Sequence, residues 1–216
     1  MTERPWAAAL GSLAGRAAGM PAQKPLRIDT DFRRDEYVDS VSVAAVELRD
    51  ALRSEDAEAF FSTARCTIDS GGPFWSKLVD DLDELPRRAR ATALRRLPAV
   101  AERAAIEIAD RAAKSQWVYI VSEFPLLNWS LGERRHPVHG RIDIIGWSAR
   151  AVHIVDLKTV RWIPRQAIPE HARQVERYVE HLPVDDGLLV RASALYVDQD
   201  GSDARWLIVH PASSDN

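Results

Sequence analysis

The spacing of hydrophobic residues changes near Gln116. Before this point apolar residues recur at roughly helical spacing, as in Asp39–Ala64. Strong helix formers (alanine, glutamate and arginine) fill Leu97–Lys114. After Gln116 the chain contains runs rich in β-branched and aromatic residues, which are typical of strands. The pattern therefore predicts a helical first half and a second half that contains both strands and a helix.

The expected elements follow in order along the chain. The small apolar stretch Pro5–Met20 predicts a surface helix. Further helices are expected at 39–64, after the break at Ser70–Pro73, and at 97–114. Strands are expected at 116–127, as a pair within 139–159, and at 187–198 and 204–211; a helix over Pro164–Leu182, with Pro169 near its start, separates the two groups.

This order predicts an α/β protein with a mixed sheet flanked by helices. We place a division near residue 70. Residues 1–70 form a helical N-terminal region, either an appendage or part of the same domain, and residues 71–216 form the domain that contains the sheet.

Composition narrows the classes of protein. The chain has 216 residues, 46% of them hydrophobic and 28% charged, as in globular proteins. No apolar run approaches the ~18 residues that span a bilayer, so we expect no membrane association and a cytoplasmic location. The single cysteine, Cys66, excludes a Cys₄ zinc site, and no iron–sulfur cluster is expected. The formal net charge of −3 restricts any nucleic-acid surface to a local patch.

Two acids and a lysine interrupt the apolar strand pair within 139–159. Asp143 lies in the first strand, and Asp156 and Lys158 lie on one face of the second. If the hairpin turns tightly around Ala149–Arg150, Asp143 stands directly across from Asp156. Ala-Arg is a poor two-residue turn, so a longer loop with another register is the alternative. Two carboxylates at that distance repel, and Mg²⁺ or Mn²⁺ would relieve the repulsion. The alternative is an ion pair at the edge of a sheet.

Four short motifs extend this pattern. They are "VSEFPL" (Val121–Leu126), "GRID" (Gly140–Asp143), "IVDLKT" (Ile154–Thr159) and "QVERY" (Gln174–Tyr178). Together, and in this order, they resemble the PD-(D/E)XK nuclease superfamily, and within it the RecB-like exonuclease domains. The resemblance covers about Gly72 to Val197.

The resemblance implies a restriction-endonuclease-like core and a metal-dependent deoxyribonuclease, an exonuclease rather than an endonuclease, acting in DNA repair, recombination or phage and mobile-element processes. It implies Mg²⁺ or Mn²⁺ held by Asp143, Asp156 and the carbonyl of Leu157, with Lys158 as the catalytic lysine. Gln174 and Tyr178 would face the DNA and the active site. The remaining expectations are Glu123 as an orienting acid, and Arg141, Arg161 and Arg165 as phosphate contacts.

One part of the family pattern is missing. Family members carry an earlier helix with a Gly-x-x-x-His motif whose histidine is a metal ligand. The best positional match here is Gly72–Asp81, which has Ser76 in place of the histidine. Asp80, Glu102 and Glu107 are the possible replacements, and His136 and His139 precede the acidic strand.

Three functional hypotheses follow. The first is the DNA nuclease, with a separate helicase or recombination protein as a further partner implied by the resemblance. The second is a catalytically degenerate module that keeps the fold and binds DNA or a partner protein, which Ser76 motivates. The third is a structural cluster of ion pairs with no role in nucleic-acid chemistry.

Overall fold

A computed structural model describes residues 5–19, 26–28, 33–53, 85–126, 140–184 and 187–210. Its centre is a six-stranded sheet whose strands lie side by side in chain order. The strands are β1 (Leu26–Arg27), β2 (Tyr119–Leu126), β3 (Gly140–Trp147), β4 (Ala151–Val160), β5 (Leu189–Asp198) and β6 (Ala204–His210).

The sheet is mixed, as the sequence predicts. Neighbouring strands are antiparallel except β4 and β5, which are parallel along all ten residues of β4. Parallel neighbours need a crossover connection, and helix α6 (Pro169–His181) provides it. The expected α/β class, with a mixed sheet between helices, is therefore confirmed.

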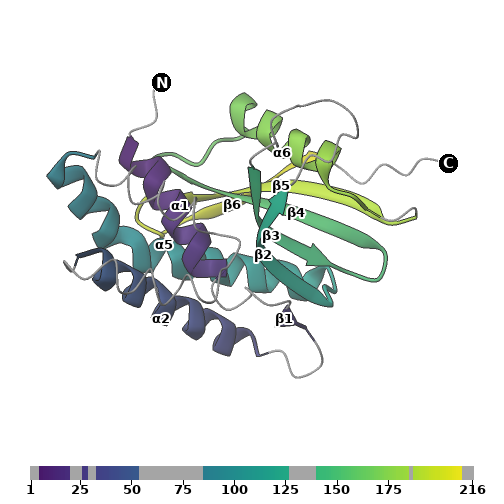
Figure 1. Ribbon diagram of the computed structural model, residues 1–216, viewed down its shortest axis with the longest axis horizontal. Helices are drawn as coiled ribbons and strands as arrows, with labels where there is room; N and C mark the ends of the chain where they lie inside the picture. Colours follow the sequence, from purple (N-terminus) through teal and green to yellow (C-terminus); the bar gives the residue numbers. More distant parts are fainter. Residues whose placement is uncertain are drawn as a thin grey trace.

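Helices cover both faces of the sheet (Figure 1). Helices α1 (Pro5–Gly19), α2 (Arg34–Arg53) and α5 (Arg87–Lys114) lie on one side, and α6 lies on the other. The alternation of side chains along β4 divides the core between them. Val155 and Leu157 pack with α1, α2 and α5, whereas Ile154 packs with Val175 and Tyr178 of α6.

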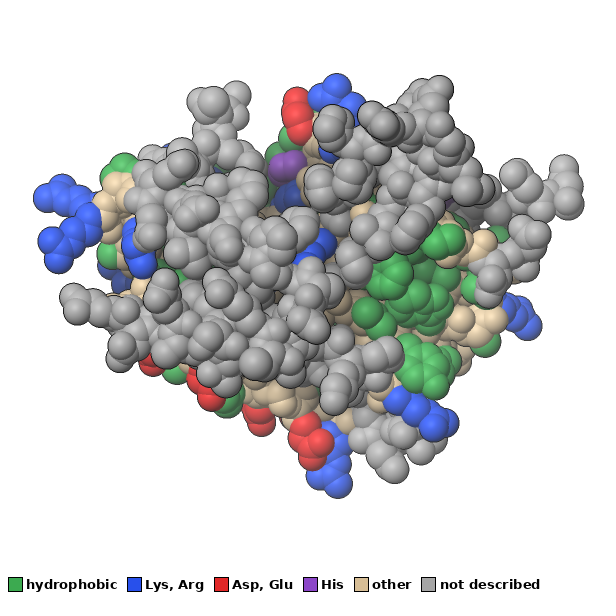
Figure 2. Space-filling view, in the orientation of Figure 1, with side chains coloured by type: hydrophobic (Ala, Val, Ile, Leu, Met, Phe, Trp, Pro, Cys, Tyr) green, Lys and Arg blue, Asp and Glu red, His purple; other side chains and the backbone are tan. Residues whose placement is uncertain are grey.

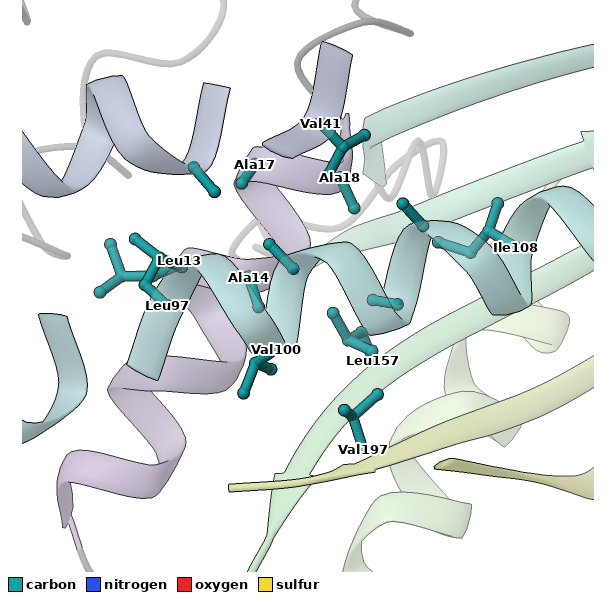
Figure 3. Packing of buried hydrophobic residues seen from close by; sticks show 14 of the residues in the cluster. Leu13, Ala14, Ala17, Ala18, Val41, Leu97, Val100, Ile108, Leu157 and Val197 are labelled. Atoms are coloured by element: carbon teal, nitrogen blue, oxygen red, sulfur yellow. The ribbon is translucent and has the colours of Figure 1, made fainter. Parts of the chain in front are cut away.

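Helix α1 differs from its prediction as a surface helix. Most of its described side chains are buried, including those of Leu10, Leu13 and Ala14. Figure 3 shows α1 crossing α5 beside the sheet, with Leu13 near Leu97 of α5. The surface prediction was wrong because alanine and glycine give a weak apolar signal, while their small size lets a helix approach its neighbours closely on several sides.

Helix α2 provides an outer, charged face. Its buried side chains, such as Val41 and Leu48, join the same core cluster as α1 and α5. Acidic side chains lie along the lower margin of the molecule, over α2 (Figure 2). The described part of residues 1–70 thus shares its core with the sheet, and the division near residue 70 stays a prediction because that position lies outside the described residues.

Helix α5 begins at Arg87, ten residues before the predicted start at Leu97. The arginine-rich first turns point mainly outward, and Ala93 and Leu94 are buried on the inner side. Few apolar residues mark this inner face, so these first turns could not be recognised from the hydrophobic pattern. The predicted helices over 54–64 and after Ser70–Pro73, together with Cys66, lie outside the described residues.

Gly146 of β3 lies directly against the ring of Trp117, where there is no space for a side chain. A Cβ atom built on Gly146 of β3 would overlap the ring of Trp117, which is buried just before β2. Trp117 also packs against His153 of β4, with ring centroids 5.3 Å apart. The missing side chain at position 146 therefore lets Trp117 lie flat on the hairpin.

Candidate metal and active site

The hairpin of β3 and β4 has a tight turn, one of the two alternatives that the sequence left open. Ser148 N donates to Ala151 O at 2.9 Å, so the loop is Ala149–Arg150. The pairing runs from Trp147–Val152 to Ile144–Val155 and stops there. Continuing this register by one step places Asp143 opposite Asp156, at the point where the ladder between the two strands ends.

Beyond the last backbone pair, the side chain of Asp143 in β3 connects the two strands. Asp143 Oδ2 accepts a hydrogen bond from the backbone N–H of Leu157 at 2.7 Å. The N–H and C=O of one strand residue point toward the same neighbouring strand. The carbonyl of Leu157 therefore points toward the β3 side, where the carboxylate of Asp143 lies.

Asp156 is the most buried acid of the site. Its side chain is 1% exposed, and Lys158 Nζ lies 2.9 Å from its Oδ2 as an ion pair. Apart from this ion pair, neither carboxylate oxygen has a hydrogen-bond partner within the described part of the chain. Burial raises the pKa of Asp156, and the charge of Lys158 offsets this only in part.

Helix α6 closes the site from above the sheet. Lys158 Nζ donates to Gln174 Oε1 at 3.0 Å, and Gln174 Nε2 donates to Tyr178 Oη. Gln174 and Tyr178 thus share one face of α6, as expected for residues four apart, and their predicted contact with DNA stays a prediction. The polar atoms thus form one chain from Asp156 through Lys158 and Gln174 to Tyr178.

Tyr178 lies in the field of both acids. Burial raises its pKa, and the charges of Asp156 and Asp143 raise it further. The phenol therefore stays protonated over the physiological pH range. Because its oxygen already accepts from Gln174, its own hydrogen remains available for donation.

His171 belongs to the same face of α6 and was not predicted from the sequence. Ile168 N donates to Tyr196 Oη at 3.0 Å, and His171 Nδ1 lies 3.0 Å from the same oxygen. Burial, and then the charge of Lys158, lowers the pKa of His171 to about 4. The lowered pKa leaves the imidazole uncharged at neutral pH, and His171 Nδ1 and Tyr196 Oη share one hydrogen bond. The signal available in the sequence was its spacing, three residues before Gln174.

Glu123 lies in β2 on the other side of β3. The pairs Ser122–Ile144 and Phe124–Ile142 place its backbone opposite Asp143. Its side chain is outside the described residues, as are His136 and His139. The predicted role of Glu123 as an orienting acid stays a prediction, now with a backbone position beside the site.

The predicted phosphate contacts fall into two groups. Arg161 and Arg165 are exposed, in the segment between β4 and α6. Arg141 is only 8% exposed, and a side chain so buried offers little surface to a phosphate. The exposed pair thus remains the better candidate for contact with a nucleic acid.

Helix α1 forms a further wall beside Asp143. A Cβ atom built on Gly15 would lie 3.7 Å from Asp143 Cγ, and one on Gly11 would lie 3.2 Å from Thr159 N. The four-residue spacing of these glycines was the signal for a close helix–sheet contact. This contact was not predicted, because Gly72–Asp81 is the better positional match to the missing family motif.

The possible replacements for the missing histidine do not join the two acids in the described chain. Ser76 and Asp80 are outside the described residues. Glu102 is exposed, and Glu107 accepts hydrogen bonds from Arg103 and from Trp206 Nε1. Among described residues, no group of three or more His, Cys, Asp and Glu side chains is placed to hold a metal.

The donor atoms nevertheless fit a hard divalent cation. Asp143, the buried carboxylate of Asp156 and the carbonyl of Leu157 are all oxygen donors, as Mg²⁺ and Mn²⁺ prefer. The two oxygens of Asp156 are buried without hydrogen bonds, which is costly unless another charge approaches them. Lys158 supplies one such charge, and a cation bound to Asp143 would supply a second.

Comparisons with protein-family models, with curated proteins and with solved structures each found no match. No helix in the described ranges is both long enough and apolar enough to cross a membrane.

Proposed function

We propose that this protein is a metal-dependent nuclease that hydrolyses phosphodiester bonds of DNA. The observation that carries the proposal is the buried carboxylate of Asp156, placed beside Lys158 and opposite Asp143 where β3 and β4 separate. The expected restriction-endonuclease-like core, and hydrolysis from strand ends, rest on the sequence resemblance described above.

Each residue has a distinct role in this proposal. Asp143, Asp156 and the Leu157 carbonyl hold Mg²⁺ or Mn²⁺, which when bound lowers the pKa of a water and polarises a phosphoryl oxygen. Lys158 stabilises negative charge on the reacting phosphate from a fixed position, because Gln174 holds its ammonium group at 3.0 Å.

Tyr178 fixes the other end of this arrangement. It accepts from Gln174 Nε2, so the amide of Gln174 is oriented with its oxygen toward Lys158. The protonated phenol is also a donor that can face a phosphate oxygen. We therefore assign Gln174 to positioning and Tyr178 to positioning and substrate contact.

The second candidate function is a degenerate nuclease-fold module that binds DNA or a partner protein. The ion pair between Lys158 and Asp156 favours it, since the lysine already neutralises the buried acid. In addition, helix α1 approaches Asp143 through Gly15, which has no side chain that could bind a metal. Binding without hydrolysis in any divalent metal would identify this module.

A cleavage assay separates the two functions. Linear and circular DNA, single- and double-stranded, are incubated with the protein in Mg²⁺, in Mn²⁺ and in EDTA. The matched pair of variants is Asp156→Asn, which removes the buried charge, and Asp39→Asn, which changes an exposed acid on α2. Metal-dependent cutting that Asp156→Asn abolishes and Asp39→Asn preserves supports the nuclease. Equal cutting by all three proteins overturns it.

A further inference from the structure

An exposed tryptophan follows directly after the strand that carries the candidate site. Trp162 is 69% exposed, the largest fraction of any large hydrophobic side chain among the described residues. The guanidinium carbon of Arg161 lies 5.4 Å from its ring centroid. A single exposed ring is common on protein surfaces, so a ligand is indicated here only by the groups that surround this ring.

The ring forms one wall of a hollow of about 460 Å³. Three arginines line the same hollow, Arg96 from α5, Arg161 from the end of β4 and Arg205 from β6. An aromatic face surrounded by guanidinium groups is the arrangement by which proteins hold an unpaired nucleotide, with the base stacked and the phosphate paired.

The acids of the hollow are already used by the turn between β5 and β6. Asp198 accepts hydrogen bonds from Ser202 N and Ser202 Oγ, each at 2.8 Å. Asp200 accepts from Ser202 N at 3.1 Å, and Asp203 accepts from Ala204 N at 2.8 Å. These hydrogen bonds hold the carboxylates on their own turn, and Arg96 donates to Gln199 at 3.4 Å. Arg161 and Arg205, from the end of β4 and from β6, are therefore the groups assigned to an outside anion.

The hollow lies within reach of the candidate site. Trp162 is four residues beyond Lys158, so their Cα atoms are at most roughly 14 Å apart. Lys158 pairs with Tyr196, and Tyr196 pairs with Arg205, so Arg205 lies two strands across, about 10 Å away. A polynucleotide bound at Asp156 could therefore extend into the hollow within a few nucleotides.

We propose that the hollow beside Trp162 binds an unpaired nucleotide of a single DNA strand whose neighbouring phosphate occupies the site at Asp156 and Lys158. The base stacks on Trp162, and Arg161 and Arg205 contact the phosphates. This inference rests on the proposed function and names its substrate: a single strand or a frayed end. In a paired duplex the faces of each base are covered by its neighbours, so Trp162 discriminates against it.

Binding is measured by fluorescence anisotropy of a labelled oligothymidylate of about 16 nucleotides, the upper site size of a single-strand-binding domain. The protein is the full chain carrying Asp156→Asn, in EDTA, so that no strand is cut. Trp162→Ala is expected to weaken binding about 5- to 150-fold, the range for loss of one stacking ring. Trp162→Phe, which keeps a stacking face, should stay within about threefold of the parent.

The matched control is Ile208→Ala on β6, because Ile208 is 68% exposed and does not line the hollow. It should leave binding unchanged. Blunt duplex of equal length should bind all four proteins alike. A thermal melt of each variant verifies that the fold is intact.

The outcomes separate this inference from the proposed nuclease activity. Trp162→Ala binding that equals the parent, or that falls equally for single strand and duplex, overturns the nucleotide site, even where the wild type cleaves DNA with metal. Selective loss of single-strand binding supports the site, even where the wild type cleaves nothing and only the nuclease proposal fails.

Discussion

Replacing Asp156 with asparagine should make the protein more stable while removing its proposed activity. The side chain is 1% exposed, and neither oxygen accepts a hydrogen bond from a described residue. A buried charged group without its hydrogen bonds costs at least about 1–3 kcal/mol. Asparagine keeps the shape and removes the charge, so most of this cost is relieved.

The loss of the ion pair with Lys158 reduces the gain. Lys158 keeps its hydrogen bond to Gln174, and its side chain is 20% exposed, so its ammonium group is not left without a partner or water. We therefore expect a net stabilisation of about 1 kcal/mol for Asp156→Asn. For a chain of this length that corresponds to an increase in Tm of about 2–4 °C.

The pH dependence of the difference in stability tests whether the buried charge of Asp156 is its cause. Burial raises the pKa of Asp156 in the folded protein, so the folded state holds the proton more tightly than the unfolded state does. Below the ordinary aspartate pKa, near 4, both states are protonated and the cost is absent. The cost appears as pH rises through the raised folded pKa. The gap in Tm between variant and wild type should therefore be small near pH 4 and should widen toward neutral pH.

The assay is a thermal melt of wild type, Asp156→Asn and the exposed control Asp39→Asn, in EDTA, across this pH range. A second series adds Mn²⁺, which should stabilise the wild type by about 2.7 kcal/mol at one hundred times its Kd and leave Asp156→Asn unchanged. An Asp156→Asn protein that melts at or below the wild type at neutral pH, with a gap independent of pH, would refute the reasoning from burial.

Three further predictions concern the surroundings of the site. Gly146→Ala places a methyl group in the ring of Trp117 and should cost about 3 kcal/mol, seen as a fall in Tm of about 6–12 °C; a change under about 1 °C would contradict the packing. Burial and the nearby arginines lower the pKa of His153 to about 4, so stability should fall as pH drops below about 6.5, by at most ~1.4 kcal/mol per pH unit. His153→Gln should flatten this slope in urea titrations, and an unchanged slope would exclude His153 as its source. Tyr178→Phe should lower metal-dependent cleavage roughly 10- to 100-fold and weaken single-strand binding by less than this; a loss confined to binding would assign the phenol to binding alone.

The hairpin was the most predictable part of the fold because its pattern is local. A two-residue loop at Ala149–Arg150 sets the register, and alternation then decides which face each side chain takes. The placement of Gln174 and Tyr178 was equally accessible, since residues four apart share a helical face. These predictions needed no knowledge of distant contacts.

The position of helix α1 beside Asp143 could not be predicted from such local patterns. Helix α1 reaches Asp143 through Gly15, and its burial depends on contacts with α5 and β4 that are far away in the sequence. An alanine- and glycine-rich helix has a similar composition whether it is buried or exposed. His171 was missed for a related reason, because its hydrogen bond is to Tyr196, a residue of β5 that only the fold brings near.

The arrangement of β4 explains how the fold tolerates a buried acid. Its left neighbour in strand order, β3, stops pairing after Ile144–Val155, whereas its right neighbour, β5, pairs with all ten residues through Val160–Asp198. The opening therefore lies on one side of the strand only. Asp156 is held in register by β5 at the position where β3 leaves room for Asp143 to reach Leu157 N.

A slip of one residue in β4 would turn Asp156 and Lys158 toward α1 and α5 and would bring Val155 and Leu157 to the α6 side. The apolar residues that fix the register thus also fix the two acids and the lysine. The cost of burying Asp156 is then met by the packing of the whole sheet rather than by local contacts. For this reason, removal of the charge of Asp156 should stabilise the fold, whereas removal of the apolar side chains of Val155 and Leu157 should destabilise it.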